Sequence, residues 1–336
     1  MSRSVCDFAA HIAKNTDIKA SLVEGLDFVH FNDIVKRDSS VFVKPNFTYP
    51  EYRKGITTSP HLLRILLEIL KDRAKRVVLG ESDGGNRSFS GSDSIKGHDM
   101  YEICRETGAE AVNLSELPSV SVEEEIQGKR VRVELPKLLL DEIDCLISVP
   151  VLKVHVMTGV TLGIKNLWGC YPDTMRGLYH KNLDNKLALI TKRLNPKLVI
   201  IDGTYSLDRH GPMYGIPRRT NLLITSNNSV VADALAARVM GIPLKRANHI
   251  LVAEKERLGT TDMKDVRINC RWENFQLNYR IERTLLDYAS VPLFRSEFLA
   301  NTVMNSSLTP LIYKIGNAFK NSEERKISND IGRFRT

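Results

Sequence analysis

The stretch at residues 145–169, CLISVPVLKVHVMTGVTLGIKNLWG, indicates both the class of fold and the place of a site. It opens with an apolar run at 146–152 that is short and rich in β-branched residues, which is typical of a buried strand. Four polar residues come at the expected end of that strand or shortly after it: Lys153, His155, Lys165 and Asn166. The pattern predicts an anion-binding site at the carboxyl end of a buried strand.

Further apolar runs lie on both sides of this stretch. Those that predict strands are 41–43, 76–80, 111–114, 198–201 and 222–226. Those whose helical periodicity predicts helices are 61–73, 99–107, 183–194, 230–240 and 247–258. The alternation of the two predicts an α/β fold with a mostly parallel sheet and helices on both faces. A second lobe remains open at this point.

Three segments fall outside this alternation. Residues 119–135 alternate apolar and polar side chains around Gln127-Gly128, which predicts a β-hairpin. Residues 87–98 are rich in Ser and Gly and long for a connection, so they are a candidate lid. Helices are expected at 4–14 and 32–36. The predicted organisation is an N-terminal helical segment at 1–37, an α/β domain at 38–262 and a basic helical extension at 271–336.

Five polar clusters come directly after predicted strands. They are Lys44/Asn46, Asp83/Gly84/Gly85, Lys153/His155, Asp202/Gly203 and Ser226/Asn228. In an open parallel α/β sheet, ligands bind outside the carboxyl ends of the strands. We therefore expect these clusters to surround one site.

The chain of 336 residues carries a formal net charge of +8, and most of the excess lies in one segment. Residues 151–220 hold eleven Lys and Arg against four Asp. No RNP motif, zinc finger or basic helix accompanies them, so nucleic acid is not the expected partner. A focused positive cleft suits an anionic small molecule. No apolar run reaches the ~20 residues that span a bilayer, and a cytoplasmic location is expected.

The five cysteines are scattered and form no C-x-x-C pair. That spacing predicts neither a disulfide framework nor a self-contained iron–sulfur cluster. A divalent metal stays open, because His155, His180 and Asp202 could form a site of two histidines and one carboxylate.

Candidate roles follow from residue type and position. The candidate catalytic residues are His155, His180 and Asp202. The candidate substrate-binding residues are Lys44, Asn46, Asp83, Gly84, Gly85, Lys153, Lys165, Asn166, Arg176 and Asp233. Each has a structural alternative: a histidine satisfied by backbone groups, an aspartate that caps a helix, or a lysine on a solvated face.

Several motifs occur in an order that resembles the DUF362 family of α/β proteins. They are Lys44-Pro45-Asn46, Ser82-Asp83-Gly84-Gly85, VPVLKVH followed by LGIKNLWG, Tyr179-His180, Ile201-Asp202-Gly203, Gly211-Pro212 and Ala232-Asp233. The resemblance covers roughly residues 38–260 and supports the α/β fold and the site map. Many members of the family carry ferredoxin-type cysteine motifs that bind [4Fe–4S] clusters, whereas this sequence carries none.

Two functions are expected from these observations. The first is an enzyme that binds a carboxylate- or phosphate-bearing small molecule in a cleft lined by Lys and His, with isomerase- or transferase-like chemistry. The alternative is a non-catalytic binding or redox-accessory protein, as the iron–sulfur relatives suggest. Residues 271–336 could dock on a protein or a membrane surface. The oligomeric state stays open.

Overall fold

Ten strands form the main sheet within the residues that the computed structural model describes, which are 8–14, 16–284, 287–288, 296 and 302. The strands are β1 (Ala9–Lys14), β2 (Ser40–Pro45), β3 (Arg76–Glu81), β4 (Glu110–Asn113), β7 (Cys145–Val149), β8 (Val151–His155), β9 (Gly159–Thr161), β10 (Leu198–Asp208), β11 (Ile216–Ser226) and β12 (Arg267–Ile268). Their order is β12-β1-β11-β10-β7-β2-β3-β4, and β8 branches off by pairing with β10 and β9.

The sheet has a parallel half and a half with antiparallel pairs. Strands β10, β7, β2, β3 and β4 are parallel to one another. Strand β11 is antiparallel to β10, and β1 is antiparallel to β11. Four of the five predicted clusters therefore lie on or directly after strands of one direction, with Asp202 and Gly203 inside β10, whereas Ser226 and Asn228 lie at the opposite edge. That part of the prediction is wrong because β11 runs the other way.

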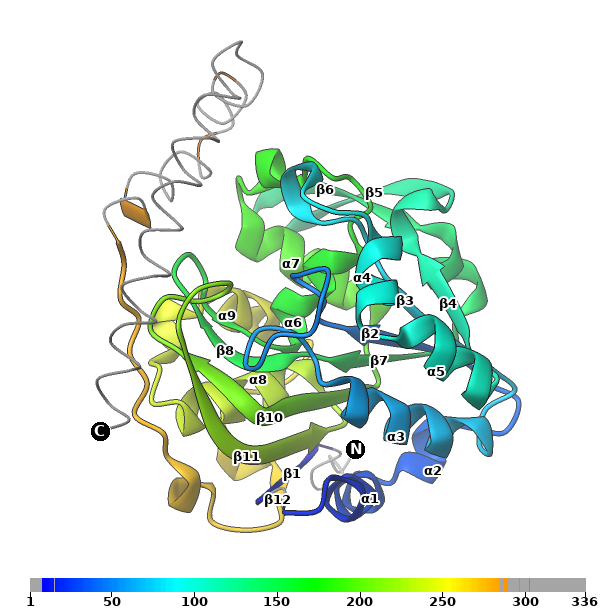
Figure 1. Cartoon of the computed structure of the whole chain (residues 1–336). Coiled ribbons are helices and arrows are strands. Elements are labelled where there is room, and N and C mark those ends of the chain that lie inside the picture. Colours follow the sequence, from blue (N-terminus) through cyan, green and yellow to red (C-terminus); the bar gives the residue numbers. More distant parts are fainter. Residues whose placement is uncertain (1–7, 15, 285–286, 289–295, 297–301, 303–336) are drawn as a thin grey trace, which may run out of the picture.

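Helices cover both faces of the sheet (Figure 1). They are α1 (Ile18–Phe28), α2 (Phe31–Ile34), α3 (Pro60–Lys71), α4 (Gly91–Gly97), α5 (Met100–Thr107), α6 (Gly163–Asn166), α7 (Leu183–Leu194), α8 (Ser229–Val239) and α9 (Asn248–Lys255). Short 3-10 turns lie at Gly85–Arg87, Leu114–Glu116, Leu167–Cys170, Arg176–Tyr179, Leu244–Arg246, Met263–Asp265 and Trp272–Phe275, and a π-helical turn lies at Leu138–Glu142.

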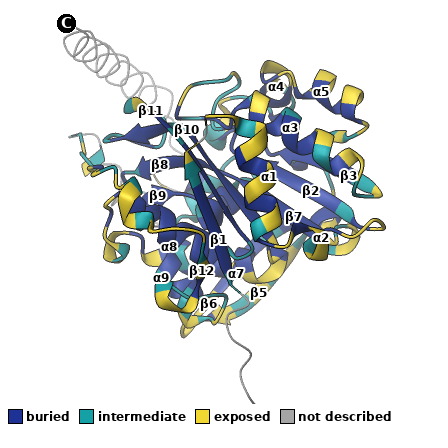
Figure 2. Cartoon of the chain, turned by 90° about the horizontal axis from the view of Figure 1, so that it is seen from below, coloured by how far each residue is buried: buried dark blue, intermediate teal, exposed yellow. Residues whose placement is uncertain are grey.

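The core lies in two layers, one on each side of the sheet. Val41 and Val43 of β2 pack in the layer formed with α1, α3 and α5, whereas Phe42 packs in the layer formed with α7, α8 and α9. This alternation follows from the two-residue period of a strand. Figure 2 shows the buried sheet between the two groups of helices. The predicted α/β fold with helices on both faces is therefore confirmed.

A separate two-stranded sheet forms at the predicted hairpin. It consists of β5 (Ser119–Ile126) and β6 (Lys129–Pro136), which pair antiparallel around Gln127 and Gly128. Both turn residues have positive φ values, 48° and 71°, which a tight hairpin turn requires. The hairpin packs on α7. The hairpin prediction is confirmed.

Three sequence expectations are wrong. Residues 9–14 form strand β1 rather than a helix, because pairing with β11 outweighs local helix propensity. The N-terminal segment is therefore part of the main sheet. Residues 87–98 are not a plain loop, since they contain α4, which begins with a capping box at Ser90 and Asp93. The run at 146–152 is two strands, divided at Pro150.

The C-terminal extension lies largely outside the described residues. Its described part includes a short helical turn at Trp272–Phe275, and residues 287, 288 and 302 are also helical. Among the helices of the described part of the chain, none is long and apolar enough to cross a membrane.

Candidate functional site

A buried ion pair joins the carboxyl ends of two neighbouring strands. Lys44 of β2 and Glu81 of β3 are 2.6 Å apart between Nζ and Oε1, and both side chains are almost fully buried. Lys44 also donates to the carbonyl oxygen of Pro45 at 2.7 Å. Glu81 accepts from the backbone N–H groups of Phe47 and Ser82 at 3.0 and 3.1 Å. Lys44 therefore neutralises Glu81 rather than a ligand.

Lys153 of β8 is buried and donates all of its ammonium hydrogens to the protein. Its acceptors are Asn46 Oδ1 at 2.7 Å, Thr48 Oγ1 at 3.0 Å and the carbonyl oxygen of Ile56 at 2.7 Å. Burial and the nearby Lys165 lower the pKa of Lys153 well below its usual range. An ammonium group offers three donors, so none remains for a ligand. Lys153 holds the segment after β2 in place.

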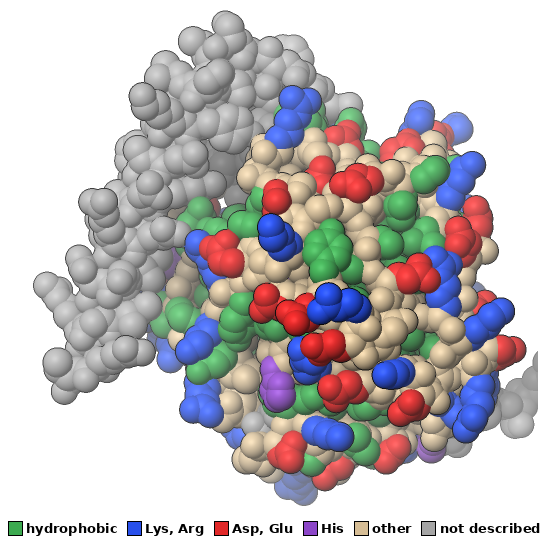
Figure 3. Space-filling view, turned by 45° about the vertical axis from the view of Figure 1, so that its right-hand side comes forward, with side chains coloured by type: hydrophobic (Ala, Val, Ile, Leu, Met, Phe, Trp, Pro, Cys, Tyr) green, Lys and Arg blue, Asp and Glu red, His purple; other side chains and the backbone are tan. Residues whose placement is uncertain are grey.

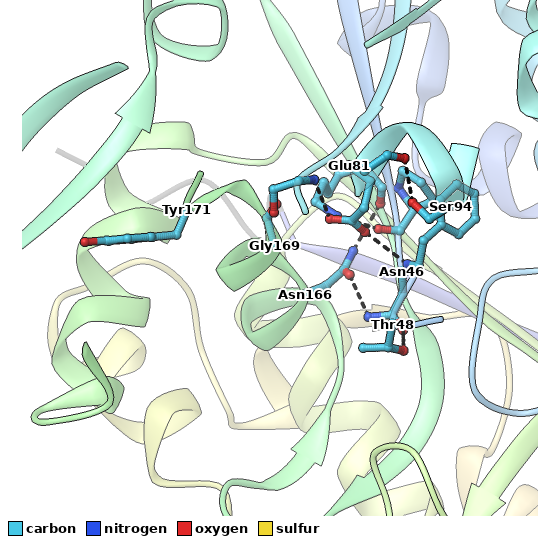
Figure 4. Close-up of polar contacts among 12 residues, drawn as sticks. Asn46, Thr48, Glu81, Ser94, Asn166, Gly169 and Tyr171 are labelled. Atoms are coloured by element: carbon cyan, nitrogen blue, oxygen red, sulfur yellow. Dashed lines mark hydrogen bonds and ion pairs between the residues drawn. The ribbon is translucent and has the colours of Figure 1, made fainter. Parts of the chain in front are cut away.

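Two asparagine side chains continue this network towards α6. Asn46 Nδ2 donates to Asn166 Oδ1 at 3.0 Å, and Figure 4 shows the two amides facing each other. Asn166 Nδ2 donates to the carbonyl oxygen of Lys44 at 3.0 Å and to Ser148 Oγ at 3.1 Å. The network therefore ties β2, β7 and α6 together at one edge of the sheet.

A pocket of about 230 Å³ opens beside this network. Its polar lining comes from Asn46, Thr48, Glu81, Asn86, Ser88, His155, Thr161, Lys165, Asn166 and Arg176, and its apolar lining from Phe47, Phe89, Trp168, Pro212 and Met213, with Gly84, Gly85 and Gly169 between them. The volume is below the range of roughly 300–1,000 Å³ in which drug-sized ligands bind. The pocket suits a small metabolite.

Three buried polar atoms of the pocket lining have no hydrogen-bond partner among the described residues. They are Asn86 Oδ1, Thr161 Oγ1 and Trp168 Nε1. Buried polar groups are nearly always hydrogen-bonded, because an unpaired one costs free energy. An acceptor, a hydroxyl and a donor of pocket-lining residues therefore lack a protein partner among the described residues.

Two cations line the same pocket. Arg176 donates to Ser82 Oγ at 2.6 Å and to the carbonyl oxygens of Tyr171 at 3.0 Å and Asp83 at 2.5 Å. Lys165 has neither a hydrogen-bond acceptor nor a carboxylate partner within the described part of the chain, and its Nζ lies 6.0 Å from the centre of the Trp168 ring. Burial, with Arg176 nearby, lowers the pKa of Lys165 to about 7.

His155 presents one ring nitrogen to the pocket. Its Nδ1 accepts the backbone N–H groups of Met157 at 3.0 Å and Thr158 at 3.4 Å, which places the proton of the neutral ring on Nε2. Burial and the cations Lys165 and Lys153 lower its pKa well below the usual range. His155 is therefore a neutral imidazole that can donate from Nε2.

His180 does not line the pocket. It lies behind Trp168, with the two rings stacked at 5.7 Å between centroids. Burial and Lys165 lower its pKa to about 3, so its ring is neutral at physiological pH.

Three predicted aspartates hold backbone segments instead of facing the pocket. Asp83 Oδ1 accepts the N–H of Gly91 at the start of α4 at 2.7 Å. Asp202 accepts the N–H of Ser59, the N-cap of α3, at 2.9 Å, and lies within β10 rather than after a strand.

The predicted metal-binding set of His155, His180 and Asp202 is not assembled. The described residues contain no group of three His, Cys, Asp or Glu that could hold a metal.

Asp233 of α8 fixes the start of α6. Its two oxygens accept the N–H groups of Gly163 at 2.6 Å and Ile164 at 2.9 Å. Burial raises its pKa to about 7 against these two hydrogen bonds. Asp233 thus positions the helix that carries Lys165 and Asn166.

Seven of the predicted site residues line the pocket: Asn46, Gly84, Gly85, His155, Lys165, Asn166 and Arg176. Sequence reasoning missed Glu81, although a charged residue at the end of the buried strand 76–80 was a usable signal. It also missed Trp168, Thr161 and Asn86, because a single aromatic, hydroxyl or amide residue carries no pattern of its own. Nothing in the sequence indicated that the apolar residues Phe47, Phe89 and Met213 line the pocket.

Part of the basic excess of residues 151–220 is balanced by acids from elsewhere in the chain. Lys192 and Arg193 pair with Glu124, and Arg209 pairs with Glu282 at 3.0 Å. On the face shown in Figure 3, Lys and Arg are interspersed with Asp and Glu. Of the cations in this segment, Lys165 and Arg176 line the pocket.

Comparisons with known proteins agree with the family resemblance. The family model of a domain of unknown function, DUF362, matches residues 41–238. A thylakoid-associated protein of Synechocystis sp. is 25% identical over 243 residues, which cover 68% of this chain and 70% of that protein. The crystal structure of a Thermotoga maritima protein matches with a TM-score of 0.37 and 11% identity over 72% of this chain and 59% of that one, less than two thirds of its length.

Proposed function

This chain belongs to the DUF362 family, and we propose that it is an enzyme that binds a small anionic metabolite in its pocket and transfers a proton on it. The observation that carries the proposal is that four residues with an unpaired polar group line one small pocket: Lys165, Asn86, Thr161 and Trp168 each have a polar atom without a hydrogen-bond partner among the described residues. Buried groups of this kind normally have partners. A ligand that supplies them would be bound selectively.

The charge of the ligand follows from the two cations. Lys165 and Arg176 line the pocket, and Glu81, the carboxylate in its lining, is already paired with Lys44. A carboxylate or phosphate between Lys165 and Arg176 would make charge-assisted hydrogen bonds with both. Trp168 and Phe47 would cover the apolar part of a ligand.

The chemistry follows from the protonation states of His155 and Lys165. With a pKa of about 7, Lys165 is divided between amine and ammonium at neutral pH, so it can accept a proton and return it. His155 stays neutral and would polarise a substrate carbonyl through Nε2–H. Proton transfer next to a carbonyl, as in an isomerisation, uses both groups. Glu81 and Lys153 would hold the site rigid.

Trp168 provides a direct test, because the chain has two tryptophans and only Trp168 lines the pocket. In a Trp272→Phe background, titration with sulfate should change Trp168 fluorescence in a saturable way. Lys165→Met should abolish the change, whereas Lys137→Met, an exposed lysine outside the pocket, should leave it intact. A signal that survives Lys165→Met would contradict the proposed anion site.

The remaining inferences from the sequence are part of this proposal. We infer that the protein carries no iron–sulfur cluster, binds no nucleic acid and acts in the cytoplasm, with a divalent metal left open. Elemental analysis of the purified protein tests whether it contains an iron–sulfur cluster or a divalent metal. The thylakoid-associated relative makes a membrane surface the alternative location, which would favour docking through residues 271–336. Cell fractionation of the full chain and of a chain cut at residue 270 distinguishes the two.

A further inference from the structure

The backbone of Lys165 is held firmly, although its amine has no hydrogen-bond acceptor among the described residues. Its helix, α6, is fixed at one end by Asp233, which accepts the N–H groups of Gly163 and Ile164. At the other end, Asn166 is bound to β2 and β7 through the carbonyl oxygen of Lys44 and Ser148 Oγ. The backbone of Lys165 is therefore fixed on both sides, so its amine is delivered to one wall of the pocket.

The titratable groups that interact electrostatically with Lys165 are basic side chains from three elements. Arg176 lies on the turn Arg176–Tyr179 and His180 directly after it, Lys153 and His155 lie on β8, and His249 lies on α9. In the described part of the chain, no carboxylate lies within ion-pair distance of the Lys165 amine. A desolvated lysine next to another cation is the arrangement that makes an amine nucleophilic.

We propose that Lys165 is a carbonyl-reactive amine that forms an imine with a small aldehyde or ketone bearing a carboxylate or phosphate. This inference rests on the proposed function, since the anionic group is held by the same pocket. Arg176 would bind the anionic group and leave the carbonyl carbon next to Lys165 Nζ. His155 Nε2–H would donate to the carbonyl oxygen.

The step balances without any redox partner. The nitrogen lone pair of neutral Lys165 forms a bond to the carbonyl carbon, while the electron pair of the C=O bond moves to oxygen. The nitrogen then gives up one proton and the oxygen takes up one. The resulting carbinolamine loses water as the C=N bond forms, and the imine nitrogen can then be protonated. The iminium is an electron sink that weakens the C–H bond at the adjacent carbon. In this step Lys165 is the electron sink rather than the proton acceptor, and the water released on imine formation can take the proton.

Glyoxylate with sodium cyanoborohydride tests the proposal on the full chain. Glyoxylate supplies an aldehyde and a carboxylate, and the hydride reduces any imine to N-carboxymethyl-lysine, which peptide mass spectrometry locates. At pH 7, Lys165 should be modified at least about ten-fold faster than the exposed Lys137, because about half of the Lys165 amine is neutral at that pH and the pocket binds the carboxylate of glyoxylate. The Lys165 rate should rise with pH to a plateau with a midpoint near 7.

The controls separate this inference from the proposed function. Lys165→Arg keeps a cation for sulfate binding but cannot form an imine, so it should retain the Trp168 fluorescence response and lose the rapidly modified site. If glyoxylate changes Trp168 fluorescence but Lys165 reacts no faster than Lys137, the imine is refuted and anion binding stands. If neither glyoxylate nor sulfate binds and Lys165 is not trapped, both proposals fail. Equally rapid trapping with acetaldehyde, which carries no charge, would refute the anionic class of substrate.

Discussion

The surroundings of Lys44 and Lys153 differ from those of Lys165, although all three lysines lie at one edge of the sheet. Lys44 forms an ion pair with Glu81, and Lys153 donates hydrogen bonds to three oxygen acceptors. We call these two the paired lysines. Lys165 meets no acceptor among the described residues and faces the pocket. A lysine whose N–H donors are all hydrogen-bonded to the protein stabilises the fold. A lysine whose amine has no acceptor can instead interact with a ligand.

The largest loss of stability that this comparison predicts is expected on substitution of Lys44. Lys44→Met leaves Glu81 buried without its counter-charge, and we expect a loss of about 3–5 kcal/mol in the free energy of unfolding. Lys165→Met removes a desolvated, unpaired amine and should change stability by about 0–2 kcal/mol, in the stabilising direction. Guanidinium denaturation of both variants at pH 7 measures the difference. Equal losses would show that Lys165 has a structural partner too.

A somewhat smaller loss is expected for the second paired lysine. Lys153→Met leaves Asn46 Oδ1, Thr48 Oγ1 and the Ile56 carbonyl oxygen without this donor, which should cost about 2–4 kcal/mol. Amide hydrogen exchange should also speed up at residues 46–59, the segment that Lys153 holds. If Lys153→Met were to abolish sulfate binding while leaving stability and exchange unchanged, Lys153 would have to be reassigned as a ligand contact.

Gly169 tests how tightly the Lys44–Glu81 pair is enclosed. A Cβ on Gly169 would lie 2.6 Å from Glu81 Oε1 and 2.9 Å from Lys44 Nζ, so both groups would have to move. We expect Gly169→Ala to cost about 1–3 kcal/mol. Gly85→Ala is the matched control, because a Cβ there meets nothing within 4 Å. Thermal unfolding compares the two, and a neutral Gly169→Ala would show that the pair is loosely packed.

The smallest expected effect is on the pH dependence of sulfate binding. Lys165 has a pKa of about 7 and is a cation below that pH, so sulfate affinity should fall by about three- to ten-fold between pH 6 and pH 8. His180, with a pKa of about 3, stays neutral throughout. Lys165→Arg should flatten the profile. A slope that persists in Lys165→Arg would point to Asp233, whose pKa is also about 7 and whose carboxylate becomes charged in the same range.

Much of the fold was predictable from local pattern. The runs at 41–43 and 76–80 are apolar and β-branched, and they became β2 and β3 because such runs suit a strand covered on both faces. The direction of β11 was not predictable from its own residues, since a strand reads alike whether its neighbour is parallel or antiparallel. Strand β1 was missed for a related reason, because its partner β11 lies more than 200 residues away.

The site was predictable in position but not in roles. Polar residues at strand ends marked the correct edge, and Lys165, His155 and Arg176 do line the pocket. Asp202 and Asp233 were candidates for the chemistry, yet each accepts backbone N–H groups at the start of a helix. An aspartate that caps a distant helix cannot be told from a catalytic one in the sequence, because the N–H groups it accepts are 143 and 70 residues away.

The sequence by itself determined the α/β layering, the hairpin and the presence of lysines at the ends of buried strands, because these depend on neighbouring residues and on periodicity. Only the tertiary structure decided which lysine is paired. The acceptor of Lys153 lies 107 residues away at Asn46, and the carboxylate of Glu81 reaches Lys44 from a neighbouring strand. Whether a buried ammonium group finds an acceptor depends on contacts between strands, and those contacts leave Lys165 open to the pocket.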